Sequence, residues 1–247
     1  MIKKDLLKRI IEISHKSKEG HIASSLSVLD IIYTMYDKII VDKEKSDFIL
    51  SKGHASLALY VVLDKFGLLE ENIENFCSFN SKLGGHPTIQ IKNITASTGS
   101  LGHGLPIGVG MALANKIKKT PNNVYVIIGD GESNEGTTWE SALLASNHNL
   151  NNLYCILDYN HSNDRSLKID SVLNKFQSFN WYCVEIDGHD ENQILEALKT
   201  KSDKPIFILA NTIKGKGCKR MENNPEWHHK YPNDLEFTEI IKEVEEL

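Results

Sequence analysis

Two polar residues, Asp130 and Asn160, each follow an apolar run and lie thirty positions apart. The first run (124–128) ends at Gly-Asp-Gly, and the second (153–157) ends at Asp-Tyr-Asn. The segment between them is long enough for a helix with small and apolar residues on one face. Because the carboxyl ends of parallel strands open on the same edge of a sheet, we expect both side chains at one site. A carboxylate and an amide oxygen there suit a hard cation such as Mg2+, which usually shares a phosphorylated ligand.

Glycines flank the aspartate on both sides, at Gly129 and Gly131. They let the backbone approach a phosphate closely, and a helix that starts after them favours negative charge at its first turn. Because Gly and Asp also dominate ordinary turns, the tripeptide alone indicates only a turn. The second strand, with Asn160 in register, favours a ligand site.

Several of the ten histidines stand next to glycine at predicted loop or helix-start positions. A lone histidine in a loop is more often structural than catalytic, but a group of them indicates a site. Imidazoles titrate near neutrality, so they can move protons to and from substrate hydroxyls and a carbonyl. The segments concerned are 19–21, 51–54, 84–87 and 98–104, together with the Trp-His-His segment at 227–229, which has no glycine.

The bulk composition describes an ordinary soluble globular protein. With 247 residues the chain can bury one sizeable core, and 40% of its residues are hydrophobic. A net charge of −5 argues against nucleic-acid binding. We find no signal peptide and no membrane-span pattern, and therefore expect a cytoplasmic protein. The four cysteines form no metal-type pair, and Cys155 and Cys183 lie in apolar runs that predict buried thiols.

The elements that must position these residues follow from hydrophobic periodicity. Helices are expected at 6–13, 26–36, 56–66, 70–79, 105–116 and 191–200 and over the last fifteen residues. Strands are expected at 47–50, 124–128, 153–157, 182–186 and 206–210. Between them lie a long loop at 84–103, which its size predicts to be functional, and an irregular segment at 214–233. Strands alternating with helices predict an α/β fold, with a mainly parallel central sheet, helices on both faces and a single domain over 1–247.

Taken together, these motifs resemble the N-terminal, diphosphate-binding half of transketolase, in order and spacing, across nearly the whole chain. Gly-Asp-Gly followed about thirty residues later by Asn resembles the thiamine diphosphate signature. The resemblance therefore implies thiamine diphosphate and Mg2+ as cofactors, with Ca2+ or Mn2+ as possible substitutes. It places the metal ligands at Asp130, Asn160 and Ser162, the last through its backbone carbonyl. It places the cofactor contacts at Ser24, His54, Gly99, Ser100, Leu101, Gly131, Asn160, Lys214 and His228.

The same resemblance implies catalytic or substrate-side roles for His21, His54, His86 and His228. These histidines would orient sugar hydroxyls and move protons while a two-carbon ketol unit passes from a ketose, or ketose phosphate, to an aldose. His103 and His229 are further candidates at positions where the family commonly has glutamine and glycine. The family usually has apolar side chains at the positions of Ser162 and Asp164, so polar residues there predict weaker contact with the cofactor rings.

A second polypeptide is also implied by the resemblance. In the family, the glutamate that activates the cofactor belongs to a pyrimidine-binding domain that follows the diphosphate domain, whereas this sequence ends at Leu247. We therefore expect one chain of a split enzyme, active only with a C-terminal, pyrimidine-domain partner, in an α2β2 assembly. Glu135 matches the family's interface glutamate, although a glutamate in a first helical turn can simply complement the helix dipole.

Three alternatives remain at this point. An NAD-binding module shares the α/β order, but no strand here leads into GxGxxG. A deoxyxylulose phosphate type of synthase would use the same cofactor, yet the 98–104 loop and the 214–229 tail resemble transketolase more closely. A non-catalytic scaffold or regulatory subunit is the third. The sequence does not identify the donor and acceptor sugars.

Overall fold

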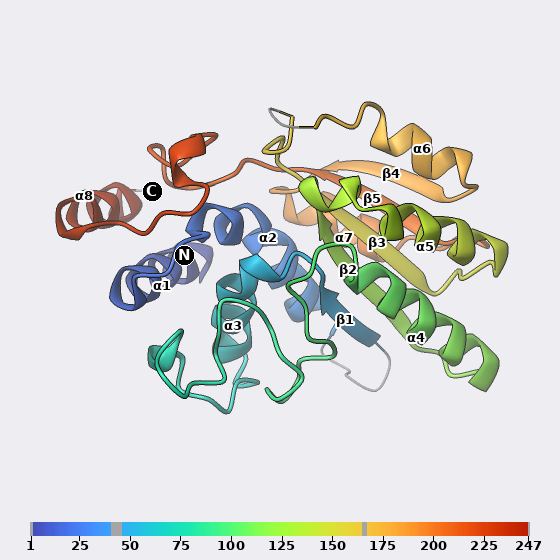
Figure 1. The fold of residues 1–247 in the computed structure, drawn as a ribbon, viewed down its shortest axis with the longest axis horizontal. Helices are drawn as coiled ribbons and strands as arrows, with labels where there is room; N and C mark the ends of the chain where they lie inside the picture. The colour runs from blue at the N-terminus through green and yellow to red at the C-terminus, as the bar shows by residue number, and fades with distance from the viewer. Residues whose placement is uncertain (1, 41–45, 165–166, 247) are drawn as a thin grey trace.

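A five-stranded, entirely parallel sheet forms the centre of the fold in a computed structural model that describes residues 2–40, 46–164 and 167–246. The strands lie in the order β1-β2-β3-β5-β4 (Figure 1). Their bounds are β1 Ser46–Leu50, β2 Asn123–Gly129, β3 Leu153–Tyr159, β4 Tyr182–Asp187 and β5 Ile206–Asn211. All five agree with the expected strands to within two residues at either end. The prediction of a mainly parallel α/β sheet is confirmed.

Helices cover both faces of this sheet, as predicted. Successive strand residues point to opposite faces. Tyr125 and Ile127 of β2 therefore join one core, with α2 (Ile22–Lys38), α3 (Ser56–Lys65) and α7 (Glu191–Leu198). Val124 and Val126 join a second core, with α4 (Gly104–Lys118), α5 (Gly136–Asn147) and α6 (Val172–Ser178). The remaining helices, α1 (Ile2–Ser17) and α8 (Asp234–Glu245), pack together at one end of the molecule (Figure 1).

Local chemistry explains where the helices start. At α8, the Asn233 side chain accepts from the Glu236 backbone N–H, and the Glu236 side chain accepts from the Asn233 N–H, which is a complete capping box. At α7, the Asp190 carboxylate accepts from two backbone N–H groups in the first turn. Four short 3-10 helices complete the described elements: η1 Gly53–Ala55, η2 Ile73–Asn75, η3 Gly131–Asn134 and η4 Pro225–Trp227.

Two expectations need correction, and one helix was not expected. The helix expected at 70–79 is wrong, since only η2 forms there: the Asn72 side chain caps one turn, which ends where Phe76 takes a ψ of 129°, and Cys77 then has a positive φ of 52°. The sequence pattern does not predict helix α6, because its seven residues bury only two apolar side chains. Cys155 is buried as predicted, but Cys183 is only partly buried.

The 84–103 segment has no helix or strand, as predicted, and several hydrogen bonds tie it to the rest of the fold. The Tyr60 hydroxyl donates to the His86 carbonyl at 3.1 Å, and the Thr98 hydroxyl donates to the Leu50 carbonyl at 2.7 Å. These bonds hold the loop against α3 and the end of β1. None of the described helices has the length and apolar character needed to cross a bilayer.

Candidate active site

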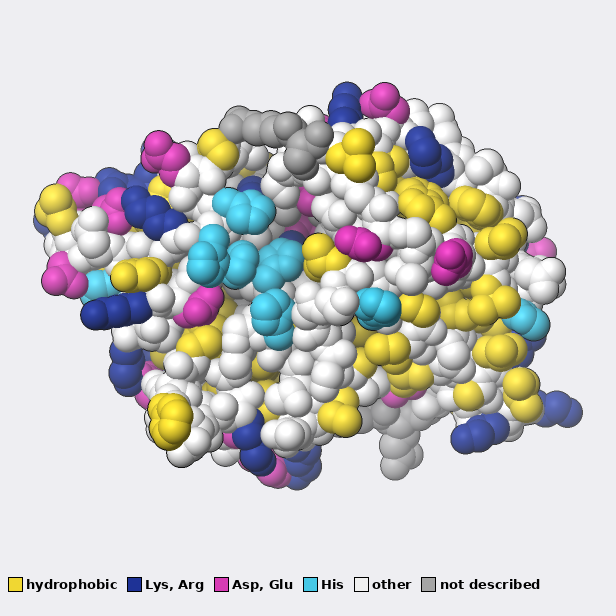
Figure 2. Space-filling view, viewed as in Figure 1, with side chains coloured by type: hydrophobic (Ala, Val, Ile, Leu, Met, Phe, Trp, Pro, Cys, Tyr) yellow, Lys and Arg dark blue, Asp and Glu magenta, His cyan; other side chains and the backbone are white. Residues whose placement is uncertain are grey.

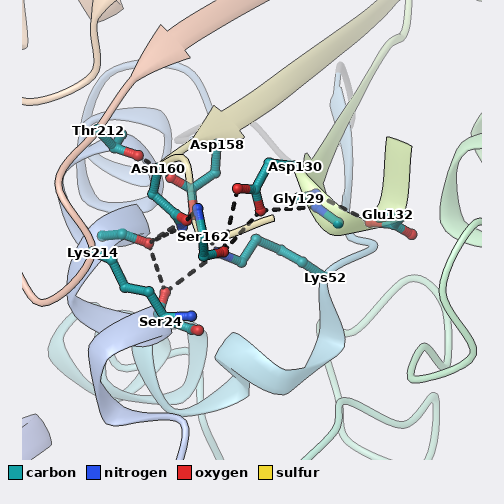
Figure 3. A network of polar contacts seen from close by, with 12 residues as sticks. Ser24, Lys52, Gly129, Asp130, Glu132, Asp158, Asn160, Ser162, Thr212 and Lys214 are labelled. Atoms are coloured by element: carbon teal, nitrogen blue, oxygen red, sulfur yellow. Dashed lines mark hydrogen bonds and ion pairs between the residues drawn. The ribbon is translucent and has the colours of Figure 1, made fainter. Parts of the chain in front are cut away.

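The carboxyl ends of β2 and β3 lie next to each other, since Gly129 pairs with Asp158 in the parallel ladder. Asp130 follows β2 directly and Asn160 follows β3 directly, so both side chains lie at this edge of the sheet (Figure 3). Both are buried. The structure thus brings together the two residues on which the prediction of a metal site depended.

Ser162 connects the two side chains. Its hydroxyl lies 3.1 and 3.2 Å from the two carboxylate oxygens of Asp130, and its backbone N–H donates to the Asn160 Oδ1 atom at 3.2 Å (Figure 3). The Asn160 amide nitrogen is turned away, toward the Ser27 hydroxyl and Asp158, each at 3.3 Å. The amide oxygen therefore faces the Asp130 side. This all-oxygen donor set fits a hard divalent cation, with one carboxylate to balance its charge.

A buried ion pair between Lys52 and Asp158 lies next to this edge of the sheet. Both side chains are at most 1% exposed. Burial by itself would raise the pKa of Asp158, but the Lys52 charge and hydrogen bonds from Lys52, Thr212 and Ser27 hold it below its ordinary value. Sequence reasoning missed this pair. The alternation Asp-Tyr-Asn at the end of β3 was the available signal, since it points Asp158 and Asn160 to the same side.

Glu132 is a second buried acid that the sequence pattern did not single out. One carboxylate oxygen accepts from the Ser51 hydroxyl and from the Gly102 N–H at 2.8 Å, and the other accepts from the Gly129 N–H at 3.2 Å. Burial raises its pKa. The side chain thus ties the loop before α4 to the ends of β1 and β2.

The four predicted catalytic histidines, His21, His54, His86 and His228, line one cavity of about 350 Å³. The ring centroid of His21 lies 5.2 Å from that of His54 and 6.1 Å from that of His228. Figure 2 shows histidine side chains gathered around a hollow on this face. The same cavity reaches the oxygen cluster, since Asp130, Asn160 and Ser162 also line it.

An adjoining pocket, also of about 350 Å³, extends this cavity. The two hollows share Asn160, Ser162, Lys214 and His228 as lining residues. Asp164 lines the adjoining pocket only, at a position where the family usually has an apolar side chain. Its Oδ2 atom lies 3.1 Å from Nδ1 of His161.

Burial and neighbouring positive charge set the protonation of the cavity. Burial, then the nearby histidines, lower the pKa of His21 to about 4, and burial, then Lys52, lower that of His54 to about 2. Burial, then Lys52, also lower the pKa of Lys214 to about 8. The Lys214 ammonium lies 3.1 Å from the Nδ1 atom of His228 and lowers the pKa of that imidazole. Neutral imidazoles keep one donor and one acceptor nitrogen, which suits them to orient hydroxyl groups.

Most of the predicted cofactor contacts line the cavity as well: Ser24, Gly99, Leu101, Gly131 and Lys214. Gly99 has a φ of +145°, and a Cβ atom there would lie 3.1 Å from the His86 ring, so glycine is required. Ser100 is exposed and is not among the lining residues. Its role, like those of the other assigned residues, stays a prediction.

The three remaining candidates lie outside the cavity. His103 is exposed at the N-cap of α4 and does not line the hollow. His229 is exposed, with its ring 4.4 Å from that of His21. Glu135 is exposed at the N-cap of α5, after η3 rather than directly after Gly-Asp-Gly. Whether Glu135 becomes shielded is a property of the assembly, so its interface role stays a prediction.

Residues 6–242 match the family described as transketolase, thiamine diphosphate binding domain. The chain belongs to the transketolase family. It is 36% identical over 255 residues to a subunit of the apulose-4-phosphate transketolase of Phocaeicola vulgatus, covering 97% of this chain and 91% of that one. It is 33% identical over 243 residues to the 6-deoxy-6-sulfo-D-fructose transketolase subunit SqwG of Clostridium sp. strain MSTE9, covering 92% and 88%.

Solved structures agree with this assignment. The transketolase of Campylobacter jejuni superposes with a TM-score of 0.86 at 28% identity, covering 99% of this chain and 42% of that one. The transketolase of Leishmania mexicana gives a TM-score of 0.89 at 21% identity, which shows the shared fold. The chain therefore spans about two-fifths of the length of these two transketolases and nearly all of the subunits named above.

These matches confirm the predicted family and the predicted class of activity, ketol transfer of the transketolase type with thiamine diphosphate. They decide against the NAD-binding alternative.

Proposed function

We propose that this chain is the diphosphate-binding subunit of a split transketolase and that it holds thiamine diphosphate through Mg2+ at the β2–β3 edge. The observation that carries the proposal is the oxygen cluster of Asp130, Asn160 and Ser162, which opens into the histidine-lined cavity. A hard cation held there would present its remaining coordination positions to a diphosphate. Lys214, at the same cavity, adds a positive charge for that anion.

The cofactor, when bound, supplies a nucleophilic carbon and an electron sink for cleaving the C2–C3 bond of a ketose. The role of this chain is to orient the sugar and to handle its protons. His21 and His54 are uncharged at neutral pH, so each can accept a hydrogen bond from a substrate hydroxyl. His86 and His228 lie across the same cavity, where they would contact other hydroxyl groups.

The proposal includes a partner subunit that carries a pyrimidine-binding domain. The two chains would form an α2β2 assembly in the cytoplasm. Apolar side chains exposed on α4 and α5 support an interface on that face: Ile107, Ile117, Leu143 and Leu144 (Figure 2). They are between 39% and 72% exposed, and a monomer rarely leaves such a group uncovered. Two relatives are themselves named as subunits, which also supports a second chain. Those two names carry different sugars, so the substrate of this chain has to be found by assay.

The test has two parts. In the first, thiamine diphosphate is titrated with Mg2+ into the purified pair of subunits containing wild-type chain, Asp130→Asn or Asp130→Ala. Both substitutions remove the only carboxylate of the oxygen cluster, so we expect metal-dependent cofactor affinity to fall by at least about a hundredfold. The unfolding midpoint should fall less in Asp130→Asn than in Asp130→Ala, because the amide keeps an oxygen that can accept from the backbone N–H groups of Gly131 and Asn163.

In the second part, ketol transfer is measured with phosphorylated and unphosphorylated ketoses, for each of the two subunits separately and for the pair. We expect turnover only from the pair. Unchanged cofactor binding in Asp130→Ala would refute the site. Full activity from this chain alone would refute the split, and cofactor binding without any transfer would favour the scaffold alternative. Release of CO2 from pyruvate would favour the deoxyxylulose phosphate type of synthase.

A further inference from the structure

Three metal-ligating side chains, Glu19, His21 and His229, converge at the rim of the histidine-lined cavity. The nearest ligand atoms of all three lie within 4.8 Å of one another. One carboxylate oxygen, Oε1 of Glu19, faces both imidazoles: it lies 3.4 Å from Nε2 of His229 and 4.0 Å from Nδ1 of His21. No other such group of His, Cys, Asp and Glu occurs in the part of the chain that the structure describes.

The two segments that carry these ligands are packed closely against each other. A Cβ atom on Gly20 would lie 2.8 Å from the His229 ring and 2.9 Å from the His229 backbone, so only glycine allows this contact. Glu19 and His21, on either side of Gly20, are thereby held next to residue 229 although the chain separates them by more than 200 positions. The left-handed backbone of His21, with φ at 60°, also sets the direction of its Cα–Cβ bond. The convergence is therefore built into the backbone.

We propose that Glu19, His21 and His229 form a binding site for a borderline transition-metal ion such as Zn2+, distinct from the oxygen site for Mg2+. Two imidazoles and one carboxylate, with an open fourth position, are a ligand set that Zn2+ takes in proteins. Ligand atoms around a tetrahedral Zn2+ ion lie about 3.4 Å apart, given bonds of about 2.0–2.1 Å. The distance between Glu19 and His229 already has that value, and the 4.0 Å between Glu19 Oε1 and His21 Nδ1 exceeds it by about 0.6 Å.

Occupancy of this site would inhibit ketol transfer, a consequence that rests on the proposed function. A metal ion on Nδ1 of His21 adds positive charge at the cavity and holds the imidazole in one orientation, where it can no longer adjust to the substrate. Mg2+ would not compete, because it prefers oxygen ligands and octahedral geometry.

The direct test measures metal binding by the purified chain in excess Mg2+, which keeps the oxygen site saturated. Zn2+ is titrated by calorimetry, and Co2+ by its visible absorption, which reports imidazole coordination. Glu19→Gln and His229→Asn each remove one ligand, and His148→Asn makes the same change at an exposed histidine on the far end of α5. We expect one Zn2+ per wild-type chain and an affinity loss on the order of a hundredfold in both ligand variants, more than loss of an outer-shell partner costs. His148→Asn should bind like the wild type.

No Zn2+ binding in excess Mg2+ would overturn the proposal. So would an affinity that Glu19→Gln and His229→Asn leave unchanged, because the ion would then lie deeper, among His54, His86 and His228. Inhibition is measured on the assembled enzyme, and the rate of each variant is compared with its own metal-free rate. We expect half-maximal inhibition of the His229→Asn enzyme to need at least about tenfold more Zn2+ than that of the His148→Asn enzyme. Zn2+ binding by the chain in an assembly that shows no ketol transfer would refute the proposed function and leave this site intact.

Discussion

His21 and His54 are held in a cavity wall where an imidazolium is poorly solvated, and their pKa values of about 4 and about 2 lie below the ordinary 6.5. Between these values and 6.5, the unfolded chain binds more protons than the folded one, so stability rises with pH. We therefore expect the free energy of unfolding to reach its full value, as far as these histidines affect it, above about pH 6.5. It should fall as the pH decreases toward 4. Urea unfolding across this range measures it.

The matched variant is His54→Asn, which removes the more strongly shifted of the two imidazoles. Its free energy of unfolding should depend less on pH below 6.5 than that of the wild type. An identical pH slope in both proteins would mean that other groups cause the acid destabilisation.

Glu132 is a single side chain that satisfies three donors, from Ser51, Gly102 and Gly129. Glu132→Ala leaves those donors buried without their acceptor, at about 1–3 kcal/mol for each one that water does not reach. We expect a clearly lowered free energy of unfolding and, because Gly102 belongs to the loop that lines the cavity, weaker cofactor binding. Glu132→Gln should lie between Ala and wild type, since it keeps one acceptor.

Glu135→Ala is the natural control for this prediction. It makes the same change three residues away, at an exposed position whose side chain makes no capping hydrogen bond. Its effect on the isolated chain should stay within about 0.5 kcal/mol. Equal effects at positions 132 and 135 would contradict the role given to the buried carboxylate.

At the scale of elements, α4 can lie so close to β2 only because residue 108 has no side chain. A Cβ atom on Gly108 would lie 2.5 Å from Cγ2 of Val126, at the centre of the sheet. We expect Gly108→Ala to cost about 1–3 kcal/mol through overpacking. Adding Val126→Ala should recover part of this loss, because it removes the clashing methyl group.

Gly110, two positions along the same helix, provides the comparison. A Cβ atom there meets nothing within 4 Å. Gly110→Ala should therefore stabilise the isolated chain by about 0.5–1 kcal/mol through helix propensity. Thermal unfolding of the two variants separates the effects. Destabilisation by both would show that the clash with Val126 is not the cause.

At the scale of the whole molecule, the exposed apolar face of α4 and α5 is where we expect the second chain of the enzyme. Leu143 and Leu144 are 59% and 46% exposed on α5. Leu143→Asp would bury a charge if that face is an interface, so association with the partner should weaken by at least about 2 kcal/mol, roughly thirtyfold. Size-exclusion chromatography with light scattering measures the assembly, and unfolding of the single chain should be unchanged.

Leu235→Asp is the matched change on α8, where the side chain is 70% exposed at the other end of the molecule. It should leave assembly unaffected. If Leu235→Asp weakens assembly while Leu143→Asp does not, the interface lies at the α1–α8 end and the proposed face is wrong.

Much of this molecule could be predicted from its sequence because local rules decide it. The short apolar runs at 124–128 and 153–157 are typical of buried strands, and the helix-length segment between them predicts that the two strands are parallel. The register of that pair brings Asp130 and Asn160 together, so the centre of the candidate site followed from the same pattern. By contrast, the helix expected at 70–79 does not form: the single turn that Asn72 caps ends at an extended Phe76, followed by a left-handed Cys77.

Only the tertiary structure decided which distant residues meet. The contact between Lys52 and Asp158 joins positions more than 100 residues apart, and Glu132 reaches back to Ser51 and forward to Gly102. Apart from the Asp-Tyr-Asn alternation at the end of β3, the local sequence around these residues does not separate a buried acid from an exposed one. Glu19, His21 and His229 meet for the same reason, since their distance depends on how the segment after β5 returns across the start of α2. Local sequence determines strands, turns and caps, whereas such contacts depend on the packing of the whole chain.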